Sequence, residues 1–255
     1  MKNDRKEHRT QTEQFRLDGY LALPGFLDEQ EIAELREHVF RFIATVVPTM
    51  PREEVFYEDK NDPTSLKQLQ RMFQFDSYFY DLMMDSRFTE LASTLLAHDV
   101  RGINLQYFNK PPGIGRATPA HQDGHYFMIE PSEAVTMWLA LEDVDEENGC
   151  IRYVRGSHLR GLRPHGRTNT LGFSQGLLDF GTADDTQNEV ALPARSGDLL
   201  VHHSLTIHRA DGNRSINRTR QALGFIYFSS DAIESDEKHQ RHAKLMEELK
   251  RSGQV

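Results

Sequence analysis

Two histidines and an aspartate lie close together in the segment TPAHQDGHYF, residues 118–127. His121 and Asp123 are two positions apart, and side chains at i and i+2 of a β-strand point to the same face. A strand here would aim an imidazole and a carboxylate at one point. A metal site needs a further ligand, and LLVHHSLTIHRADGNRS offers three later histidines: His202, His203 and His208. Two histidines and one carboxylate with open positions suit non-haem Fe(II).

Arg220 opens the segment RQALGFIYFS, which has the residue types of a β-strand. Its guanidinium can hold a carboxylate through two parallel hydrogen bonds, which a lysine cannot do. An oxygenase that uses 2-oxoglutarate needs such a group for the far carboxylate of this cosubstrate. In a strand, Ala222 and Gly224 share a face with Arg220, and these small residues leave room for a bound molecule. For Arg214 and Arg218 a surface position is the simpler interpretation.

The elements that must position these residues fall into two groups. Helices come first: one follows Asp28, which with Glu31 has the spacing of a capping box, and a second helical stretch runs from about Ser65 to Leu96 with a break near Asp76. From about residue 102 the chain changes to short β-branched and aromatic segments separated by turn residues. These predict the strands INLQYF, AVTMWLALEDV, CIRYV, DLLVHHSLTIH and RQALGFIYFS.

This order of elements predicts an α+β fold with a mainly β core: a double-stranded β-helix (a cupin-like jelly roll) with N-terminal helices packed on one sheet. We expect a single domain over residues 1–255. Its parts would be a mostly helical section over 16–100, a jelly-roll core over 101–230 and a C-terminal helix over 231–255. Residues 160–195 carry little strand signal, and a long loop of this kind inside a domain is typical of a lid.

Composition limits the classes of function. The 255-residue chain has a formal charge of −9 and a pI near 5.7, which argues against broad electrostatic binding to nucleic acid or anionic membrane. A single cysteine, Cys150, excludes an internal disulfide. The polar N-terminus lacks the apolar segment of a signal peptide, and no run reaches the roughly 20 apolar residues of a membrane span. We therefore expect a cytoplasmic protein that binds a small molecule, with its oligomeric state left open.

Four segments carry a resemblance to a known family. They are FRLDGYLALPGFLDEQEI, then NKPPG followed by HQD, then MWLALEDVDEENGCIRYVRGSH, and finally GDLLVHHSLTIHRADGNRS followed by Arg220. In this order they resemble the phytanoyl-CoA dioxygenase family of Fe(II)- and 2-oxoglutarate-dependent oxygenases. The resemblance covers nearly the whole chain, and four ordered motifs are far more specific than any one of them.

The resemblance implies roles for individual residues. The iron ligands, which would also be the catalytic residues, are His121, Asp123 and His208. His208 is preferred to the other two histidines because Asn213 and Ser215 follow it at the family's spacing. The expected contacts to 2-oxoglutarate are Arg220, Gln106, Trp138, Lys67 and Ser215. Arg218 is the alternative to Arg220, and His125 is open between contact with substrate and support of a metal ligand.

The reaction implied by the resemblance is hydroxylation of a C–H bond of a small organic substrate by O2, with 2-oxoglutarate converted to succinate and CO2. Related halogenases have Ala or Gly in place of the carboxylate, so Asp123 favours hydroxylation. The alternatives are a cupin-type metalloenzyme that does not use 2-oxoglutarate and a non-catalytic ligand-binding jelly roll. Arg220 argues against the first and the complete ligand set against the second. The sequence does not select among acyl-CoA, osmolyte, phosphonate and natural-product substrates.

Overall fold

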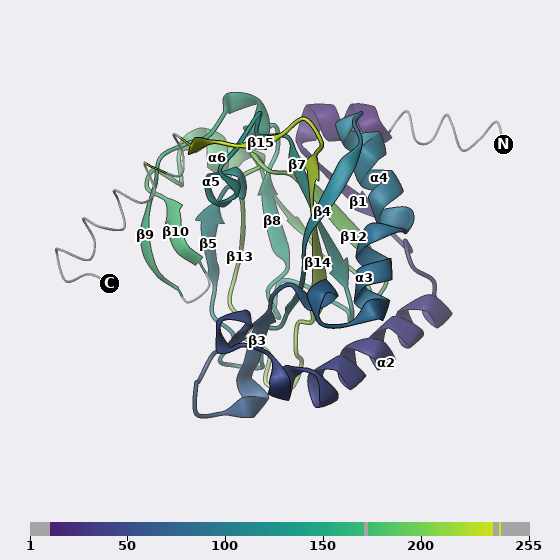
Figure 1. Ribbon diagram of the computed structural model, residues 1–255. Coiled ribbons are helices and arrows are strands. Elements are labelled where there is room, and N and C mark those ends of the chain that lie inside the picture. Colours follow the sequence, from purple (N-terminus) through teal and green to yellow (C-terminus); the bar gives the residue numbers. More distant parts are fainter. Residues whose placement is uncertain (1–10, 171–172, 237–239, 241–255) are drawn as a thin grey trace.

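The computed structural model describes residues 11–170, 173–236 and 240 of the chain. Two antiparallel sheets pack face to face in its centre (Figure 1). The larger sheet has seven strands, in the order β1 (Tyr20–Leu23), β12 (Leu199–His203), β7 (Ala134–Ala140), β14 (Ala222–Ser229), β4 (Val100–Phe108), β3 (Leu66–Leu69) and β2 (Val55–Tyr57). The smaller has four, in the order β11 (Glu189–Leu192), β8 (Ile151–Val154), β13 (His208–Ala210) and β5 (Thr118–His121).

Shorter elements surround the two sheets. Two strand pairs lie outside them: β9 (His165–Thr170) with β10 (Phe173–Leu177), and β6 (Ile129–Glu130) with β15 (Ile233–Glu234). The α-helices are α2 (Glu29–Thr45), α3 (Ser77–Met84), α4 (Arg87–Leu96), α5 (Gly124–Phe127) and α6 (Ala183–Asn188). Residues 11–18 are also helical. Single 3-10 turns cover Val47–Thr49, Arg52–Glu54, Pro63–Ser65, Met72–Gln74 and Ser157–Arg160.

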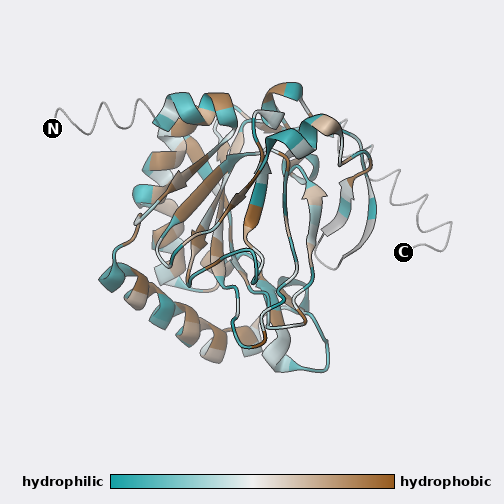
Figure 2. Ribbon diagram, turned by 180° about the vertical axis from the view of Figure 1, so that it is seen from behind, coloured by the Kyte–Doolittle hydropathy of each residue, from teal (hydrophilic) through white to brown (hydrophobic). Residues whose placement is uncertain are grey.

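Helices α2, α3 and α4 cover the outer face of the larger sheet. Asp28 caps α2, its side chain accepting from the backbone of Glu31 while the Glu31 side chain accepts from the backbone of Asp28. Apolar and polar residues alternate along α2 (Figure 2), and its buried side chains join the core over the sheet. Phe88 of α4 stacks on Phe225 of β14 with ring centroids 4.1 Å apart. These contacts fix the outer face of the larger sheet against the helices.

Strand alternation decides which side chains of the larger sheet reach the space between the sheets. Met137 and Leu139 of β7 belong to the core under the helices, whereas Trp138 between them packs toward the smaller sheet. The register aligns Trp138 with Gly224 of β14 and Gly224 with Gln106 of β4. An added Cβ at Gly224 would lie 2.7 Å from the Phe108 ring. Glycine here therefore allows Phe108 to pack beside the inter-sheet space.

The structure confirms the jelly-roll fold with helices packed on one sheet; its two sheets stay open rather than closing into a barrel. All five predicted strand segments contain strands, and the segment from 198 to 208 holds β12 and the start of β13. The capped helix after Asp28 is also present. Among the described residues, no helix has the length and apolar character that a bilayer crossing requires.

Two local predictions are wrong. The first part of the helical stretch expected over Ser65–Leu96 is instead a turn and strand β3, because Gln68 and Leu69 pair with β4 and extend the larger sheet. The part after the expected break at Asp76 is helical, as α3 and α4. Leu, Lys and Gln favour helices when isolated, and tertiary pairing overrides that preference here. The segment 160–195, expected to have little regular structure, contains β9, β10, β11 and α6. The helix expected after Ser235 falls almost wholly outside the described residues.

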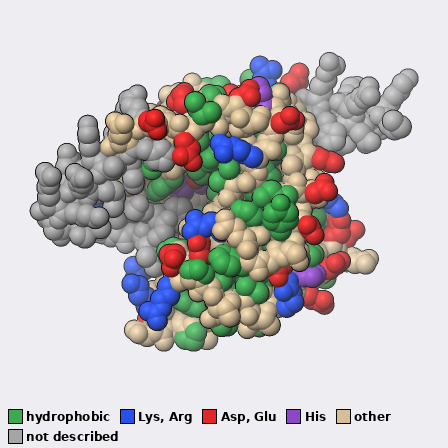
Figure 3. Space-filling view, viewed as in Figure 1, with side chains coloured by type: hydrophobic (Ala, Val, Ile, Leu, Met, Phe, Trp, Pro, Cys, Tyr) green, Lys and Arg blue, Asp and Glu red, His purple; other side chains and the backbone are tan. Residues whose placement is uncertain are grey.

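The surface agrees with the acidic composition. Acidic side chains gather along the side of the molecule on which α2 and α4 lie (Figure 3), with basic ones interspersed elsewhere. Glu29 and Glu31 stand in the first turn of α2 and Glu90 in that of α4, where negative charge complements the helix dipole. On this face, acidic side chains thus lie over the helices that cover the larger sheet.

The free energy of unfolding should decrease at acidic pH because of His203. Burial, together with His158 and His202, lowers the pKa of His203 from 6.5 to about 4. Below pH 6.5 the unfolded chain takes up a proton that the folded chain does not accept until about pH 4. The free energy of unfolding should therefore decrease as the pH falls from 6.5 to 4, by at most about 3 kcal/mol for this group.

The replacement His203→Asn isolates this effect. Nδ1 of His203 accepts from the backbone N–H of Leu205 at 3.1 Å, and an asparagine amide oxygen can take over that contact without titrating. Urea unfolding between pH 7 and pH 4 should show a smaller loss of stability in the variant than in the wild type. Equal pH slopes would assign the acid sensitivity to other groups.

Candidate active site

The pairing of β5 with β13 brings two histidines together. His208 is the direct cross-strand partner of His121, and their ring centroids lie 4.2 Å apart. Asp123 reaches the two histidines in another way than strand alternation predicted. Strand β5 ends at His121, and Asp123 has helical backbone angles (φ −58°, ψ −34°) as the residue that precedes α5. The turn into α5, rather than strand alternation, therefore carries the carboxylate to the histidines.

Hydrogen bonds to backbone carbonyls fix the tautomer of both histidines. Nδ1 of His121 lies 2.8 Å from the Pro119 carbonyl, and Nδ1 of His208 lies 3.0 Å from the Thr206 carbonyl. A carbonyl oxygen only accepts, so each Nδ1 carries the proton and each Nε2 presents a lone pair. The two Nε2 atoms lie 3.5 and 3.7 Å from Oδ1 of Asp123. This arrangement suits a cation shared by the three side chains.

The protonation states also suit a metal. Burial alone would raise the pKa of Asp123, but its interactions with the nearby His208, His121 and His202 outweigh this effect and hold the pKa well below 3.8. Burial, with His121 and His202 nearby, lowers the pKa of His208 well below 6.5. Near neutral pH the site thus offers a carboxylate and an uncharged imidazole, which are the forms that bind metals. Among the described residues, His121, Asp123 and His208 are the group that could hold an ion.

The other two candidate histidines lie outside this group. Nε2 of His202 is 3.1 Å from Oδ2 of Asp123, the carboxylate oxygen turned away from the ligand atoms. The Thr136 hydroxyl donates to the same oxygen at 2.6 Å. The ring of His203 lies near Phe15 and His158, on the side of β12 that faces the chain's first helix. His202 therefore supports Asp123, and His203 belongs to packing.

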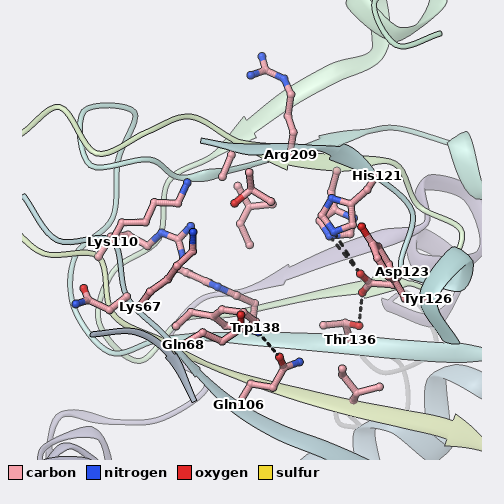
Figure 4. Close-up of a pocket in the computed structure, with 18 of the residues that line it drawn as sticks. Lys67, Gln68, Gln106, Lys110, His121, Asp123, Tyr126, Thr136, Trp138 and Arg209 are labelled. Carbon is pink, nitrogen blue, oxygen red and sulfur yellow. Dashed lines mark hydrogen bonds and ion pairs between the residues drawn. The ribbon is translucent and has the colours of Figure 1, made fainter. Parts of the chain in front are cut away.

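A cavity of about 240 Å³ extends from this triad between the two sheets. Figure 4 shows His121, Asp123 and Tyr126 at one end, Lys67 and Lys110 at the other, and Trp138 between them. Arg220 also lines the cavity, as does Gln106, whose amide oxygen accepts from Gln68 at 2.8 Å. Basic side chains thus line the end of the cavity opposite the triad, together with the carboxylate of Glu58.

Arg220 and Arg218 differ sharply in environment. Arg220 is 5% exposed; its Nε donates to the Gly149 carbonyl at 3.2 Å, and its guanidinium carbon lies 5.2 Å from the centre of the Trp138 ring. Burial lowers its pKa to about 10, so it keeps its charge at neutral pH. Arg218 is instead a partly exposed arginine ion-paired with Asp145 and Glu147. Of the two, Arg220 faces the cavity.

The sequence did not single out two residues at the cationic end. Nζ of Lys110 donates to the Asp211 carbonyl at 2.6 Å, and burial together with Arg220 and Lys67 lowers its pKa well below 10.5. Glu58 forms an ion pair with Lys67 at 3.2 Å. Lys110 stands in the NKPPG motif, where a lysine two residues after the end of a strand and before a turn was the available signal.

Two expected site residues lie elsewhere. Ser215 is not a cavity-lining residue: its hydroxyl donates to the Arg218 carbonyl at 2.7 Å and bonds the Asn213 side chain, closing the loop before β14. His125 lies in α5 and turns toward the β9–β10 hairpin, where its Nε2 donates to the side-chain oxygen of Gln175 at 2.7 Å. Both side chains therefore act on loops around the cavity.

Comparison with known proteins gives consistent matches. The family model described as phytanoyl-CoA dioxygenase (PhyH) matches residues 15–222. A phytanoyl-CoA dioxygenase of Arabidopsis thaliana is 26% identical over 256 residues, covering 87% of each chain. The epimerase SnoN in complex with Fe3+, alpha ketoglutarate and nogalamycin RO is 25% identical, with a TM-score of 0.71 over 91% of this chain and 87% of that one. EvdO2 from Micromonospora carbonacea var. aurantiaca, complexed with 2-oxoglutarate, is 25% identical, with a TM-score of 0.69 over 89% and 92%.

Removal of any of the three side chains should abolish tight metal binding. Calorimetric titration of metal-free protein with Co(II) should show a site whose affinity drops by at least about a hundredfold in His121→Ala, Asp123→Ala or His208→Ala, more than loss of an outer partner would cause. His98→Ala is the matched control, because His98 is an exposed histidine paired with Asp231. Wild-type affinity in the three variants would place the metal elsewhere.

Proposed function

Because the chain belongs to the phytanoyl-CoA dioxygenase family, we propose that His121, Asp123 and His208 hold the Fe(II), and Arg220 the 2-oxoglutarate, of this oxygenase. The reaction class is that of Fe(II)- and 2-oxoglutarate-dependent oxygenases, as the family match and the similar enzymes with bound iron and cosubstrate indicate. That class confirms the preferred interpretation of the sequence over a cupin-type enzyme without 2-oxoglutarate and over a binding module.

One observation carries the assignment of residues: a single cavity joins the histidine–aspartate triad to a buried arginine. The buried Arg220 guanidinium has lost much of its contact with water, and a dianion that spans the cavity would supply a compensating charge. Trp138 lies beside the Arg220 guanidinium and restricts its movement. Lys67 and Gln106 line the same cavity, which supports their expected contacts with the cosubstrate.

The division of labour follows from these positions. Bound Fe(II) with 2-oxoglutarate supplies the oxidative chemistry, in which O2 oxidises the substrate while the cosubstrate becomes succinate and CO2. His121, Asp123 and His208 would orient the metal, and Arg220 would neutralise and fix the far carboxylate. Apolar side chains such as Phe108, Trp138 and Ile151 form part of the cavity wall, and their low polarity strengthens these electrostatic contacts.

The substrate we propose is a small organic molecule that enters beside the triad and is hydroxylated at a C–H bond. Tyr126 and Phe127 of α5 and Thr118 of β5 line the cavity there, together with Ile226 of β14. The carboxylate of Asp123 supports hydroxylation rather than halogenation. Residues 1–255 would act as one catalytic domain, and the cytoplasm remains its proposed compartment.

We propose that the β9–β10 hairpin is the lid of this cavity. Its Gln175 is buried, accepts from His125 through its side chain, and exchanges backbone hydrogen bonds with the Tyr126 hydroxyl. His165 of β9 stacks on His125 with ring centroids 4.3 Å apart. Tyr126 is itself a cavity wall, so movement of the hairpin would move that wall.

Loss of Arg220 should weaken cosubstrate binding selectively. Anaerobic addition of Fe(II) and then 2-oxoglutarate to metal-free protein should produce a visible charge-transfer band, and the band reports the dissociation constant of 2-oxoglutarate. Arg220→Ala should raise that constant by about tenfold to a hundredfold, the effect of losing a charged hydrogen-bond partner. Arg218→Ala is the control and should leave it unchanged, because Arg218 is paired at the surface.

Two results would contradict these assignments. A stronger effect of Arg218→Ala than of Arg220→Ala would move the carboxylate site to the surface arginine. Absence of the band in folded wild-type protein, with no succinate formed from 2-oxoglutarate in air, would overturn the oxygenase proposal itself.

The lid proposal predicts that the open state of the hairpin is more populated in Gln175→Ala than in the wild type. This change removes one buried hydrogen bond, worth about 1 kcal/mol, and so should raise the open population about fivefold. Trypsin cleavage at the exposed Arg167 of β9 measures that population. Gln187→Ala, at an exposed position of α6, is the matched control. Equal cleavage rates in both variants would show that Gln175 does not hold the hairpin.

A further inference from the structure

His202 occupies a position that the metal triad does not require. It lies on β12, where its cross-strand partners are Thr136 of β7 on one side and Tyr20 of β1 on the other. Both His202 and Thr136 bond the same atom, Oδ2 of Asp123, at 3.1 and 2.6 Å. Two adjacent strands of the larger sheet thus hold one oxygen of a carboxylate that belongs to the opposite side of the cavity.

The contacts of His202 define its tautomer. A carboxylate oxygen accepts only, so Nε2 of His202 carries a proton and donates it to Asp123. Nδ1 then presents a lone pair, and the Tyr153 hydroxyl lies 2.9 Å from it, so this hydroxyl donates. The result is a directed chain of hydrogen bonds that runs from Tyr153 through His202 to Asp123.

This chain is rigid because its members are buried and stacked. Tyr153 is 0% exposed and His202 is 2% exposed. The Tyr153 ring stacks on Tyr20 with centroids 4.9 Å apart and planes inclined by 14°. Burial raises the pKa of Tyr153 well above 10, which keeps its hydroxyl protonated and able to donate.

The two oxygens of Asp123 therefore differ. Oδ2 is occupied by the donors on β7 and β12, whereas Oδ1 faces Nε2 of His121 and His208. A carboxylate that binds through both oxygens would occupy two positions on an octahedral ion. Together with the two histidines, such a carboxylate would leave only two coordination positions open. Three open positions are required, because a cosubstrate that binds through two atoms takes two and O2 takes one.

We propose that His202, fixed by Tyr153, is a positioning residue that reserves Oδ2 of Asp123 and so makes Asp123 a one-oxygen metal ligand. This inference rests on the proposed role of Asp123 as a ligand. Outer partners of this kind orient the coordinating group, and their loss typically costs tenfold to a hundredfold in metal affinity. Thr136 contributes the second hydrogen bond to the same oxygen.

Co(II) binding to the metal-free protein tests this role without turnover. His202→Phe removes the donor but keeps a ring of similar size. It should weaken Co(II) binding about tenfold to a hundredfold and change the visible ligand-field spectrum at saturation, because the released carboxylate can bind through both oxygens. His202→Gln should restore most of the affinity and the wild-type spectrum, because its amide nitrogen can donate from near the place of Nε2.

Two further variants keep the test decisive. Tyr153→Phe deletes a single hydroxyl, retains the stack on Tyr20 and should shift Co(II) affinity in the same direction as His202→Phe, by a smaller factor. It therefore serves if His202→Phe does not fold. His203→Asn, on the same strand but without contact to Asp123, is the control and should bind Co(II) like the wild type. Melting temperatures of the metal-free proteins separate folding effects from binding effects.

The possible results distinguish a failure of the proposed His202 role from a failure of the proposed metal site. If the wild type binds Co(II) through His121 and Asp123, but His202→Phe and Tyr153→Phe keep both its affinity and its spectrum, then the positioning role is wrong and the metal site stands. If the affinity falls in both variants and recovers in His202→Gln with the wild-type spectrum, the positioning role is supported. If the wild type binds no Co(II), the proposed metal site itself fails, and this inference fails with it.

Discussion

The pairing of β5 with β13 is the constraint on which the rest of the site depends. It sets His121 opposite His208 on neighbouring strands of the smaller sheet, so their ring nitrogens converge without any long flexible connection. A slip of one residue in this register would turn one imidazole to the far face of the sheet. Backbone carbonyls then fix both tautomers, and the turn into α5 adds Asp123. The metal-binding geometry is thus a property of backbone pairing more than of individual side chains.

The larger sheet contributes in a complementary way. Its outer face is fixed by helices, so the alternate residues of its strands, among them Trp138 and Gln106, project from a rigid surface into the cavity. Arg220, Lys67 and Lys110 gather at one end of that cavity although the chain as a whole is acidic. The lining of the cavity therefore differs from the composition of the whole chain, which says little about the ligands that the interior accepts.

The sequence was most informative where chemistry requires a fixed spacing. HxD, the later histidine segment and Arg220 indicated the site because few other functions need these residue types in this order. Periodicity alone failed for Ser65–Gln70, because pairing with β4 outweighs the helical preference of Leu, Lys and Gln. Contacts between distant segments were also beyond reach: neither the chain from Tyr153 through His202 to Asp123 nor the Lys67–Glu58 pair has a signal in local sequence. Strand parity likewise suggested a shared face for His121 and Asp123, whereas a turn creates it.

The gathering of cations at one end of the cavity has a consequence for product release. Succinate retains the far carboxylate of 2-oxoglutarate, so with Arg220 in its proposed role the end that contains it would not distinguish the spent cosubstrate from the fresh one. Discrimination between them must come from the metal end, where the keto acid has been lost. Turnover would then depend on how quickly the anion leaves the buried end of the cavity that Arg220, Lys67 and Lys110 line. Under this proposal, release of the coproduct, rather than binding of the cosubstrate, would be the step that limits the rate.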